Sequence, residues 1–224
     1  MPYRKTVFAN DQIYHIINRG IAHTPIFSSP KEYQRFLSLI DFYRYADLPT
    51  SFSHYSRLSI QDKEKFKNNF KEKLTEVFAF CLMPNHFHLL LRQNKNGGVS
   101  KMLTNLQDSY ACYFNLRHKR PGGLFQSMFK AVRIENEDQF LHVSRYIHLN
   151  PSSSFLVKTE NLISYPWSSL TAYLKPEQII WKFLDCRPIL ELANGEKKYS
   201  QFVFDRADYQ RKLAEIKHLV LENP

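Results

Sequence analysis

Short apolar runs alternate with longer amphipathic stretches through the first two thirds of the chain. Runs rich in β-forming residues predict strands at residues 12–18, 77–83 and 86–91, and a fourth strand at residues 124–134. The dipeptide Pro84-Asn85 predicts a tight turn between the second and third strands. These two strands should therefore form an antiparallel hairpin.

Apolar residues at helical spacing predict three long helices, over residues 30–46, 98–118 and 137–150. Pro30 suits the first turn of the first helix, and Pro151 is expected to end the third helix. The resulting order is strand, helix, strand, strand, helix, strand and helix. This order predicts an α+β, ferredoxin-like split βαβ fold, with an antiparallel sheet and helices on one face.

Two regions are less regular. Residues 47–75 are rich in lysine and have Phe66, Phe70 and Leu74 four positions apart, which predicts an amphipathic helix in an insertion. Residues 152–224 follow as a helical C-terminal extension, expected to pack on the same domain as residues 1–151. The last predicted helix of this extension carries an apolar face of Tyr209, Leu213, Ile216 and Val220.

The composition indicates a folded, basic protein. Lys and Arg outnumber Asp and Glu by 31 to 21, for a net charge of +10, which suits nucleic acid but also an ordinary basic protein. The three cysteines are far apart, which argues against a disulfide framework or a zinc cluster. We find no signal peptide and no apolar run of about 18 residues, so a cytoplasmic location is expected.

Two histidines, His86 and His88, are two residues apart on a predicted strand, so both imidazoles point to the same face. That spacing allows both rings to bind one cation. Taken alone, however, the motif favours the simpler interpretation of two polar residues on an exposed sheet face.

The third helix carries a polar stripe of His142, Tyr146 and Asn150 at a spacing of four residues. A separate apolar stripe of Phe140, Val143 and Ile147 suits packing on the sheet. Tyr146 is therefore expected to point away from the core, and Asn150 could offer its amide oxygen to a metal. The alternative is a polar helix face with an ordinary surface tyrosine.

Together these residues satisfy a mechanism of phosphoryl transfer. Two imidazoles and an amide oxygen leave open positions on a divalent cation, and an oxygen of a scissile phosphate can fill one of them. A neighbouring tyrosine can then attack phosphorus and form a phosphotyrosine bond. Phosphate favours Mg²⁺ or Mn²⁺ as the metal.

The segments Leu82-Met-Pro-Asn-His-Phe-His-Leu-Leu-Leu and Arg145-Tyr-Ile-His-Leu-Asn-Pro resemble the two hallmark segments of the single-tyrosine HUH transposases. Within that family the chain is most similar to the bacterial REP-associated tyrosine transposases. Further agreement occurs at Tyr14-His-Ile-Ile-Asn-Arg-Gly and Tyr165-Pro-Trp-Ser-Ser. The resemblance extends over roughly residues 10–175, in register.

The resemblance implies a nucleophile at Tyr146 and metal ligands at His86, His88 and Asn150. Members of the family cleave single-stranded DNA beside a hairpin, become linked to the 5′ phosphate and release a 3′ hydroxyl. A second 3′ hydroxyl then attacks the linkage and rejoins the strands. A bacterial, nucleoid-associated location and a monomeric or homodimeric state are implied.

Four basic residues are candidate DNA contacts: Arg19, Lys130, Arg133 and Arg145. Each could instead be a solvated surface charge. A rival function is a non-catalytic module of ferredoxin-like fold that binds single-stranded nucleic acid through aromatic residues on its sheet. A structural zinc protein that uses His86, His88 and a cysteine is a third candidate, and a replication or conjugation nickase is a fourth.

Overall fold

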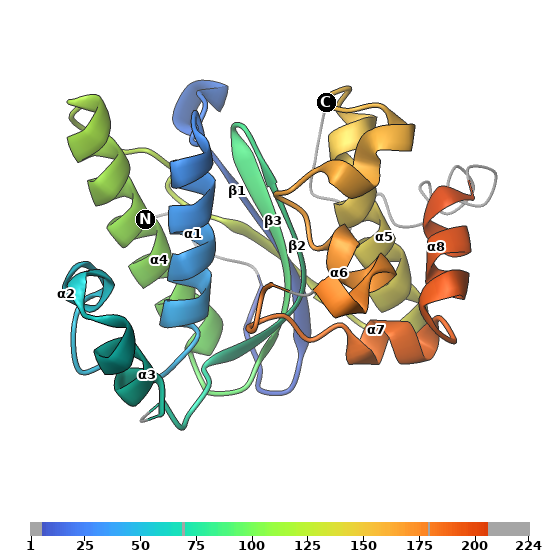
Figure 1. Cartoon of the computed structure of the whole chain (residues 1–224), viewed down its shortest axis with the longest axis horizontal. Helices are drawn as coiled ribbons and strands as arrows, with labels where there is room; N and C mark the ends of the chain where they lie inside the picture. The colour runs from blue at the N-terminus through green and yellow to red at the C-terminus, as the bar shows by residue number, and fades with distance from the viewer. Residues whose placement is uncertain (1–5, 69, 179, 206–224) are drawn as a thin grey trace.

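A four-stranded antiparallel sheet between two layers of helices forms the core of the computed structural model, which describes residues 6–68, 70–178 and 180–205 (Figure 1). The strands are β1 (Ile13–Arg19), β2 (Thr75–Met83), β3 (His86–Gln93) and β4 (Lys130–Ile134), in the order β2-β3-β1-β4. All neighbouring strands are antiparallel. The predicted ferredoxin-like fold is thus confirmed.

Helices α1 (Pro30–Tyr43) and α4 (Gly98–His118) connect the strands and cover one face of the sheet, as predicted. Helix α1 begins after Ser29, whose backbone N–H donates to the Glu32 carboxylate over 3.2 Å, and Pro30 occupies the first turn. The apolar side chains of both helices meet the sheet in one core cluster, which includes Phe36 and Tyr110.

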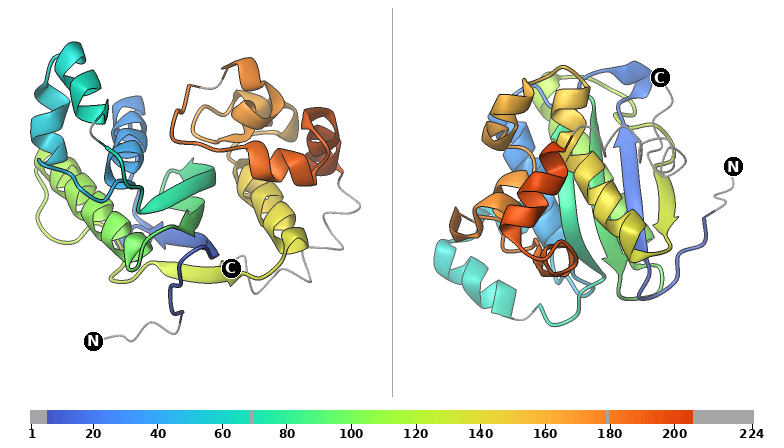
Figure 2. Two further views of the ribbon diagram at one scale, coloured as in Figure 1. Left: turned by 90° about the horizontal axis from the view of Figure 1, so that it is seen from below. Right: turned by 90° about the vertical axis from the view of Figure 1, so that its right-hand side faces the viewer.

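Helix α5 (Glu137–Ser153) covers the opposite face of the sheet, so helices lie on both faces and not on one face as predicted (Figure 2). The C-terminal helices α6 (Leu170–Leu174), α7 (Arg187–Leu192) and α8 (Glu196–Phe204) pack around it. Because α5 lies between the sheet and these helices, it is buried on more than one side. Its end differs from the prediction: the helix passes through Pro151 to Ser153, since a proline in the last turn removes little of the hydrogen-bond ladder.

The insertion forms two short helices, α2 (Phe52–Arg57) and α3 (Ile60–Asn68), beside α1. The predicted amphipathic helix is too long, because α3 ends before Phe70 and Leu74. The backbone N–H of Leu74 instead donates to the carbonyl oxygen of Arg44, 2.7 Å away, which leads the chain into β2. Short 3₁₀ helices are η1 (Ile21–His23), η2 (Thr159–Ser164) and η3 (Pro176–Gln178).

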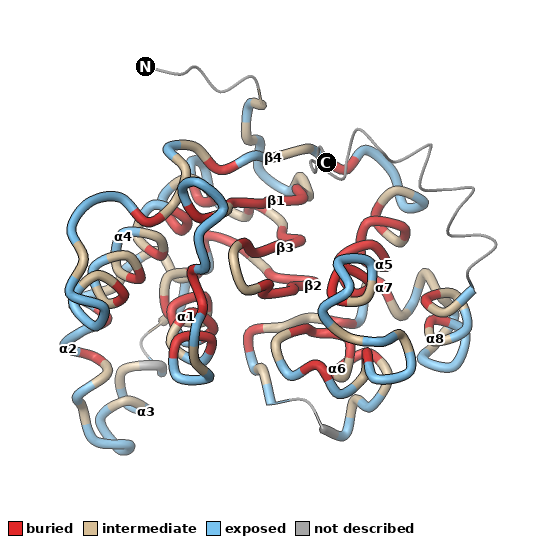
Figure 3. The backbone as a smooth tube through the Cα atoms, turned by 90° about the horizontal axis from the view of Figure 1, so that it is seen from above, coloured by how far each residue is buried: buried red, intermediate tan, exposed pale blue. Residues whose placement is uncertain are grey.

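The predicted fourth strand is also too long, because β4 begins at Lys130. Residues 124–129 instead form a connection along the end of β1, where the N–H of Gln126 donates to the carbonyl oxygen of Arg19 over 2.9 Å. Figure 3 shows strands β1, β2 and β3 and the inner helix faces as the buried parts of the backbone, whereas β4 is mostly exposed or intermediate. The predicted last helix, with Tyr209, lies outside the described residues. None of the helices described here has the length and apolarity needed to cross a membrane.

His148 joins α5 to the C-terminal helices in a site without solvent exposure. One ring nitrogen lies 2.7 Å from the hydroxyl of Tyr199 and the other 2.7 Å from the hydroxyl of Ser169. Burial lowers the pKa of His148 to about 3. His148 is therefore neutral in the folded protein at pH values where the unfolded chain binds a proton.

We expect stability to fall as the pH drops below the ordinary histidine pKa of about 6.5. Between that value and the folded-state pKa, the unfolded chain binds the extra proton, so His148 contributes a slope of about 1.4 kcal/mol per pH unit. Urea unfolding of wild type and His148→Gln from pH 7 to pH 4 measures this slope. Equal slopes in the two proteins would show that His148 is not the titrating group.

Candidate active site

The two histidines of the hairpin lie on the sheet face that is covered by α5. In the register of the sheet, His88 is opposite Ile17 of β1 and His86 is opposite Arg19. Phe87 is directed to the other face, into the core formed with α1 and α4. The sequence-based prediction that both imidazoles share one face is confirmed.

The imidazoles of His86 and His88 are adjacent and roughly perpendicular, with ring centroids 5.0 Å apart and an interplanar angle of 82°. His86 is held by its neighbour in the turn, since its Nδ1 lies 2.6 Å from Oδ1 of Asn85. An imidazole N–H at Nδ1 donates to this oxygen, so the lone pair of the neutral ring is at Nε2.

A third histidine, His15 of β1, holds His88 in the same way. Its Nε2 lies 3.0 Å from Nδ1 of His88, and the two rings are stacked with centroids 5.2 Å apart. Both side chains are fully buried. Sequence reasoning missed His15, although its spacing from Ile17 and Arg19 on one strand places it on the same face as the hairpin histidines.

Tyr146 of α5 completes the cluster. Its ring meets those of His15 and His88 edge-on, with centroids 6.0 Å and 5.7 Å away. The expectation that Tyr146 points away from the core is wrong, because this side chain is 4% exposed and faces the sheet. Since α5 is covered on both sides, its polar stripe is buried as well. Tyr146 meets the histidines of the sheet, whereas the ring of His142 packs against Phe202 of α8, with centroids 4.9 Å apart.

Asn150 lies one turn after Tyr146 and is also buried. Its Nδ2 donates a hydrogen bond to the Tyr146 hydroxyl over 3.2 Å. Contacts thus connect all four residues predicted to carry the chemistry, from His86 through His88 and Tyr146 to Asn150.

The donor set of this cluster suits a divalent cation that is held by few protein ligands. In the described parts of the chain, no group of three His, Cys, Asp or Glu residues could hold a metal ion. The His86 and His88 rings, each with a hydrogen bond at Nδ1, are oriented as metal-binding imidazoles usually are, with Nε2 as the coordinating nitrogen. Amide, water or phosphate oxygens could supply the other positions.

Two of the four predicted DNA contacts lie near this cluster. Arg19 is half-buried and opposite His86, and Lys130 is exposed and pairs with Ile17, so both share the face of the histidines. Arg133 pairs with Tyr14, and the alternation of β4 directs its side chain to the other face. The structure therefore does not bring Arg133 to the site.

Arg145 has no exposed surface, which contradicts its prediction as a DNA contact. Its guanidinium carbon lies 4.6 Å from the ring centroid of Phe202, and the group donates to the backbone carbonyl of Asp205. Arg145 comes one residue before Tyr146, and the rotation of roughly 100° per residue in a helix directs it to the C-terminal helices. Its role is to tie α5 to α8.

Comparison with known proteins gives matches to transposases. Residues 54–150 match a family model described as "Transposase IS200 like". A solved structure of the REP-associated tyrosine transposase bound to a REP hairpin aligns with a TM-score of 0.55 and 14% identity. That alignment covers 83% of this chain and 93% of the other, and at this identity it shows a shared fold.

A crystal structure of a proposed transposase from Deinococcus radiodurans R1 aligns with a TM-score of 0.33 and 15% identity, over 66% of this chain and 95% of the other. No curated protein matches this chain.

Proposed function

We propose that this chain is a member of the IS200-like transposase family, whose model matches residues 54–150, and that it is a metal-dependent transesterase. It cleaves and rejoins single-stranded DNA near hairpins through a 5′-phosphotyrosine intermediate. The observation that carries this proposal is the position of Tyr146, whose ring lies against the His15–His88 pair and whose hydroxyl is bonded by Asn150.

In the proposed cleavage step, the hydroxyl oxygen of Tyr146 forms a bond to the phosphorus of one phosphodiester. The bond from phosphorus to the 3′ oxygen breaks, and this oxygen takes up a proton as the phenol loses one. The product is a 5′-phosphotyrosine and a free 3′ hydroxyl. Attack by a second 3′ hydroxyl reverses these changes and joins two strands. Because Tyr146 is 4% exposed, its surroundings must open when DNA binds.

His86 and His88 are the proposed metal ligands, through Nε2. Asn150 is the proposed third ligand, through its amide oxygen, and its amide also holds the Tyr146 hydroxyl in place. A bound Mg²⁺ or Mn²⁺ would supply positive charge to the phosphate oxygens during the transfer.

Arg19 and Lys130 are the proposed phosphate contacts, since they lie on the face of the histidines. A hairpin partner is supported by the similar solved structure, which holds a REP hairpin. The bacterial cytoplasm, in association with the nucleoid, is the proposed location. A monomer and a homodimer are both compatible with this site, and measurement of the mass in solution distinguishes them.

A covalent adduct assay tests the proposed function. Labelled single-stranded hairpin DNAs are incubated with the protein and Mn²⁺ or Mg²⁺, with an EDTA sample beside them. We expect a denaturation-resistant adduct that needs the metal, with the nucleotide on the peptide that contains Tyr146. The assay should include a hairpin DNA that a related transposase is able to cut. If this protein binds that DNA without metal and forms no adduct, the non-catalytic module is favoured.

One observation disfavours that module. Binding by base stacking needs exposed aromatic rings on the sheet. Here α5 covers the face with the histidines, and α1 and α4 cover the other face, where Tyr14 and Phe87 have no exposed surface. Within the described structure, the sheet offers no open stacking platform.

His15 should act as a positioning residue for His88. We expect His15→Ala to lower the Mn²⁺ affinity by about 10- to 100-fold, since this is the usual effect of losing a hydrogen-bond partner of a metal ligand. Mn²⁺ titration monitored by electron paramagnetic resonance measures it without DNA. His15→Gln, which keeps a hydrogen-bonding side chain, should recover part of the affinity, and the exposed His23→Ala is the control. An unchanged affinity in His15→Ala would refute this role.

A further inference from the structure

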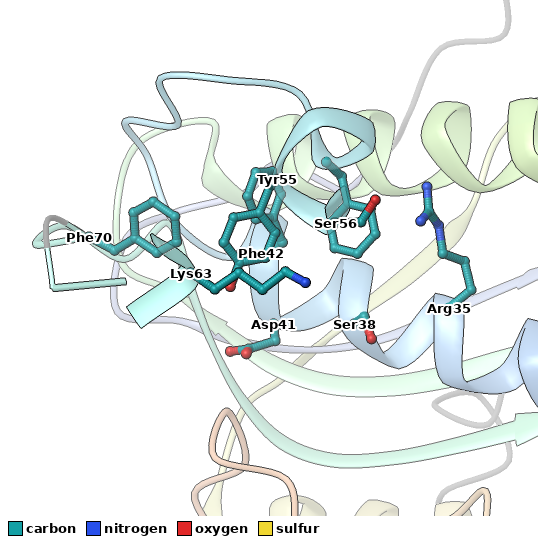
Figure 4. A pocket seen from close by; sticks show the side chains of 9 residues that line it. Arg35, Ser38, Asp41, Phe42, Tyr55, Ser56, Lys63 and Phe70 are labelled. Carbon is teal, nitrogen blue, oxygen red and sulfur yellow. The ribbon is translucent and has the colours of Figure 1, made fainter. Parts of the chain in front are cut away.

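On the side of the sheet opposite Tyr146, helices α1, α2 and α3 enclose a hollow of about 400 Å³ (Figure 4). Its lining combines two cations with aromatic rings. The cations are Arg35 of α1 and Lys63 of α3, and the rings include Phe42, Tyr55 and Phe70. None of these residues belongs to the candidate active site.

Arg35 is held between two rings. Its guanidinium carbon lies 4.2 Å from the ring centroid of Phe52 and 5.0 Å from that of Tyr113. The Nε atom is buried and has no hydrogen-bond partner, and no carboxylate of the described residues forms an ion pair with the guanidinium. Burial lowers the pKa of Arg35, which reflects the cost of a charge in this position.

A half-buried arginine that is packed in this way is suited to an anion. Its planar group presents several N–H donors in a fixed geometry, and the rings restrict its motion without occupying those donors. An anion in the hollow would supply a charged partner for this half-buried guanidinium, whose buried Nε has none.

The remaining charges of the hollow leave it positive. Lys63 extends from α3 toward the part of the hollow where Arg35 lies, as Figure 4 shows. Asp41 also lines the hollow, but its Oδ1 lies 3.2 Å from Nε of Arg44, so its charge is compensated. Two cations therefore face a space whose one carboxylate already has a basic partner.

We propose that this hollow is a nucleotide-binding site, in which Arg35 and Lys63 bind a phosphate and Phe70, the half-buried ring of the lining, contacts the base. The volume is within the usual range for small-ligand sites. The nucleotide could be a unit of single-stranded DNA or a free mononucleotide. Binding of a DNA nucleotide rests on the proposed function, whereas binding of a free mononucleotide does not.

Titration calorimetry at low salt tests the site, with inorganic phosphate, dTMP and a short oligo-dT as probes. We expect the binding of phosphate and dTMP to weaken about tenfold or more in Arg35→Gln, because a charge-assisted bidentate contact is lost. Lys63→Gln should weaken it several-fold without disturbing the ring contacts of Arg35. Arg57→Gln is the matched control, since Arg57 is exposed on α2 and does not line the hollow.

The oligo-dT measurement distinguishes the sources. If Arg35→Gln weakens oligo-dT as well as dTMP, the site binds DNA; if it weakens dTMP alone, the ligand is a free nucleotide. The proposal is overturned if the wild type does not bind dTMP. It is also overturned if dTMP binds equally well to Arg35→Gln, Lys63→Gln and Arg57→Gln. Tyr146→Phe should bind dTMP as tightly as the wild type, because Tyr146 does not line the hollow. The binding of dTMP therefore tests the hollow independently of the proposed transesterase.

Discussion

Tyr146→Phe is expected to lower the rate of adduct formation by about 10³-fold or more, because loss of a covalent nucleophile removes the reaction path itself. The substitution removes one hydroxyl and leaves the ring between His15, His88 and the body of α5. Binding of the hairpin DNA should change little. The measurement is the initial rate of adduct formation at saturating Mn²⁺, together with the DNA dissociation constant of each protein.

Tyr113→Phe is the matched control, because Tyr113 is also a helical tyrosine but lies on α4, across the sheet from the histidines. It should form the adduct at the wild-type rate. An adduct that persists in Tyr146→Phe would assign the nucleophile to another residue. Tyr110, whose hydroxyl donates to the carbonyl oxygen of Ile26, is an unsuitable substitute because burial raises its pKa far above the ordinary value.

The second large effect is expected for His88→Ala. Removal of this imidazole should lower the Mn²⁺ affinity by more than about 100-fold. Loss of only the hydrogen-bond partner of a metal ligand already lowers metal affinity by about 10- to 100-fold. Adduct formation should fall with it. His86→Ala should have a similar effect on the metal, but a smaller effect on stability, because His88 is fully buried and bonds His15 whereas His86 is 9% exposed.

Mn²⁺ titration and thermal unfolding of each variant separate these effects. His118→Gln is the control, since His118 pairs with Glu32 at the other face of the sheet. If His86→Ala and His88→Ala bind Mn²⁺ as tightly as the wild type, the ions are held elsewhere. If both lose the metal but retain full adduct formation, the proposed dependence on the metal is wrong.

Local sequence patterns predicted the strands and crossover helices well, because each rests on interactions between residues that are near in the chain. The turn at Pro84-Asn85 and the alternation of His86 and Phe87 gave the hairpin and its two faces. Errors occurred at boundaries, where tertiary contacts decide. Helix α5 continues through Pro151, and β4 is shortened because residues 124–129 bond to the end of β1.

By itself the sequence determined the strand order along the chain, the shared face of His86 and His88, and the spacing of Tyr146 from Asn150, because strand and helix periods fix these relations. Only the tertiary structure decided what each stripe of α5 meets. A helix between two layers buries its polar face too, so Tyr146 faces the sheet and Arg145 the C-terminal helices. His15 joined the site for the same reason, since strand pairing brings together residues 73 positions apart.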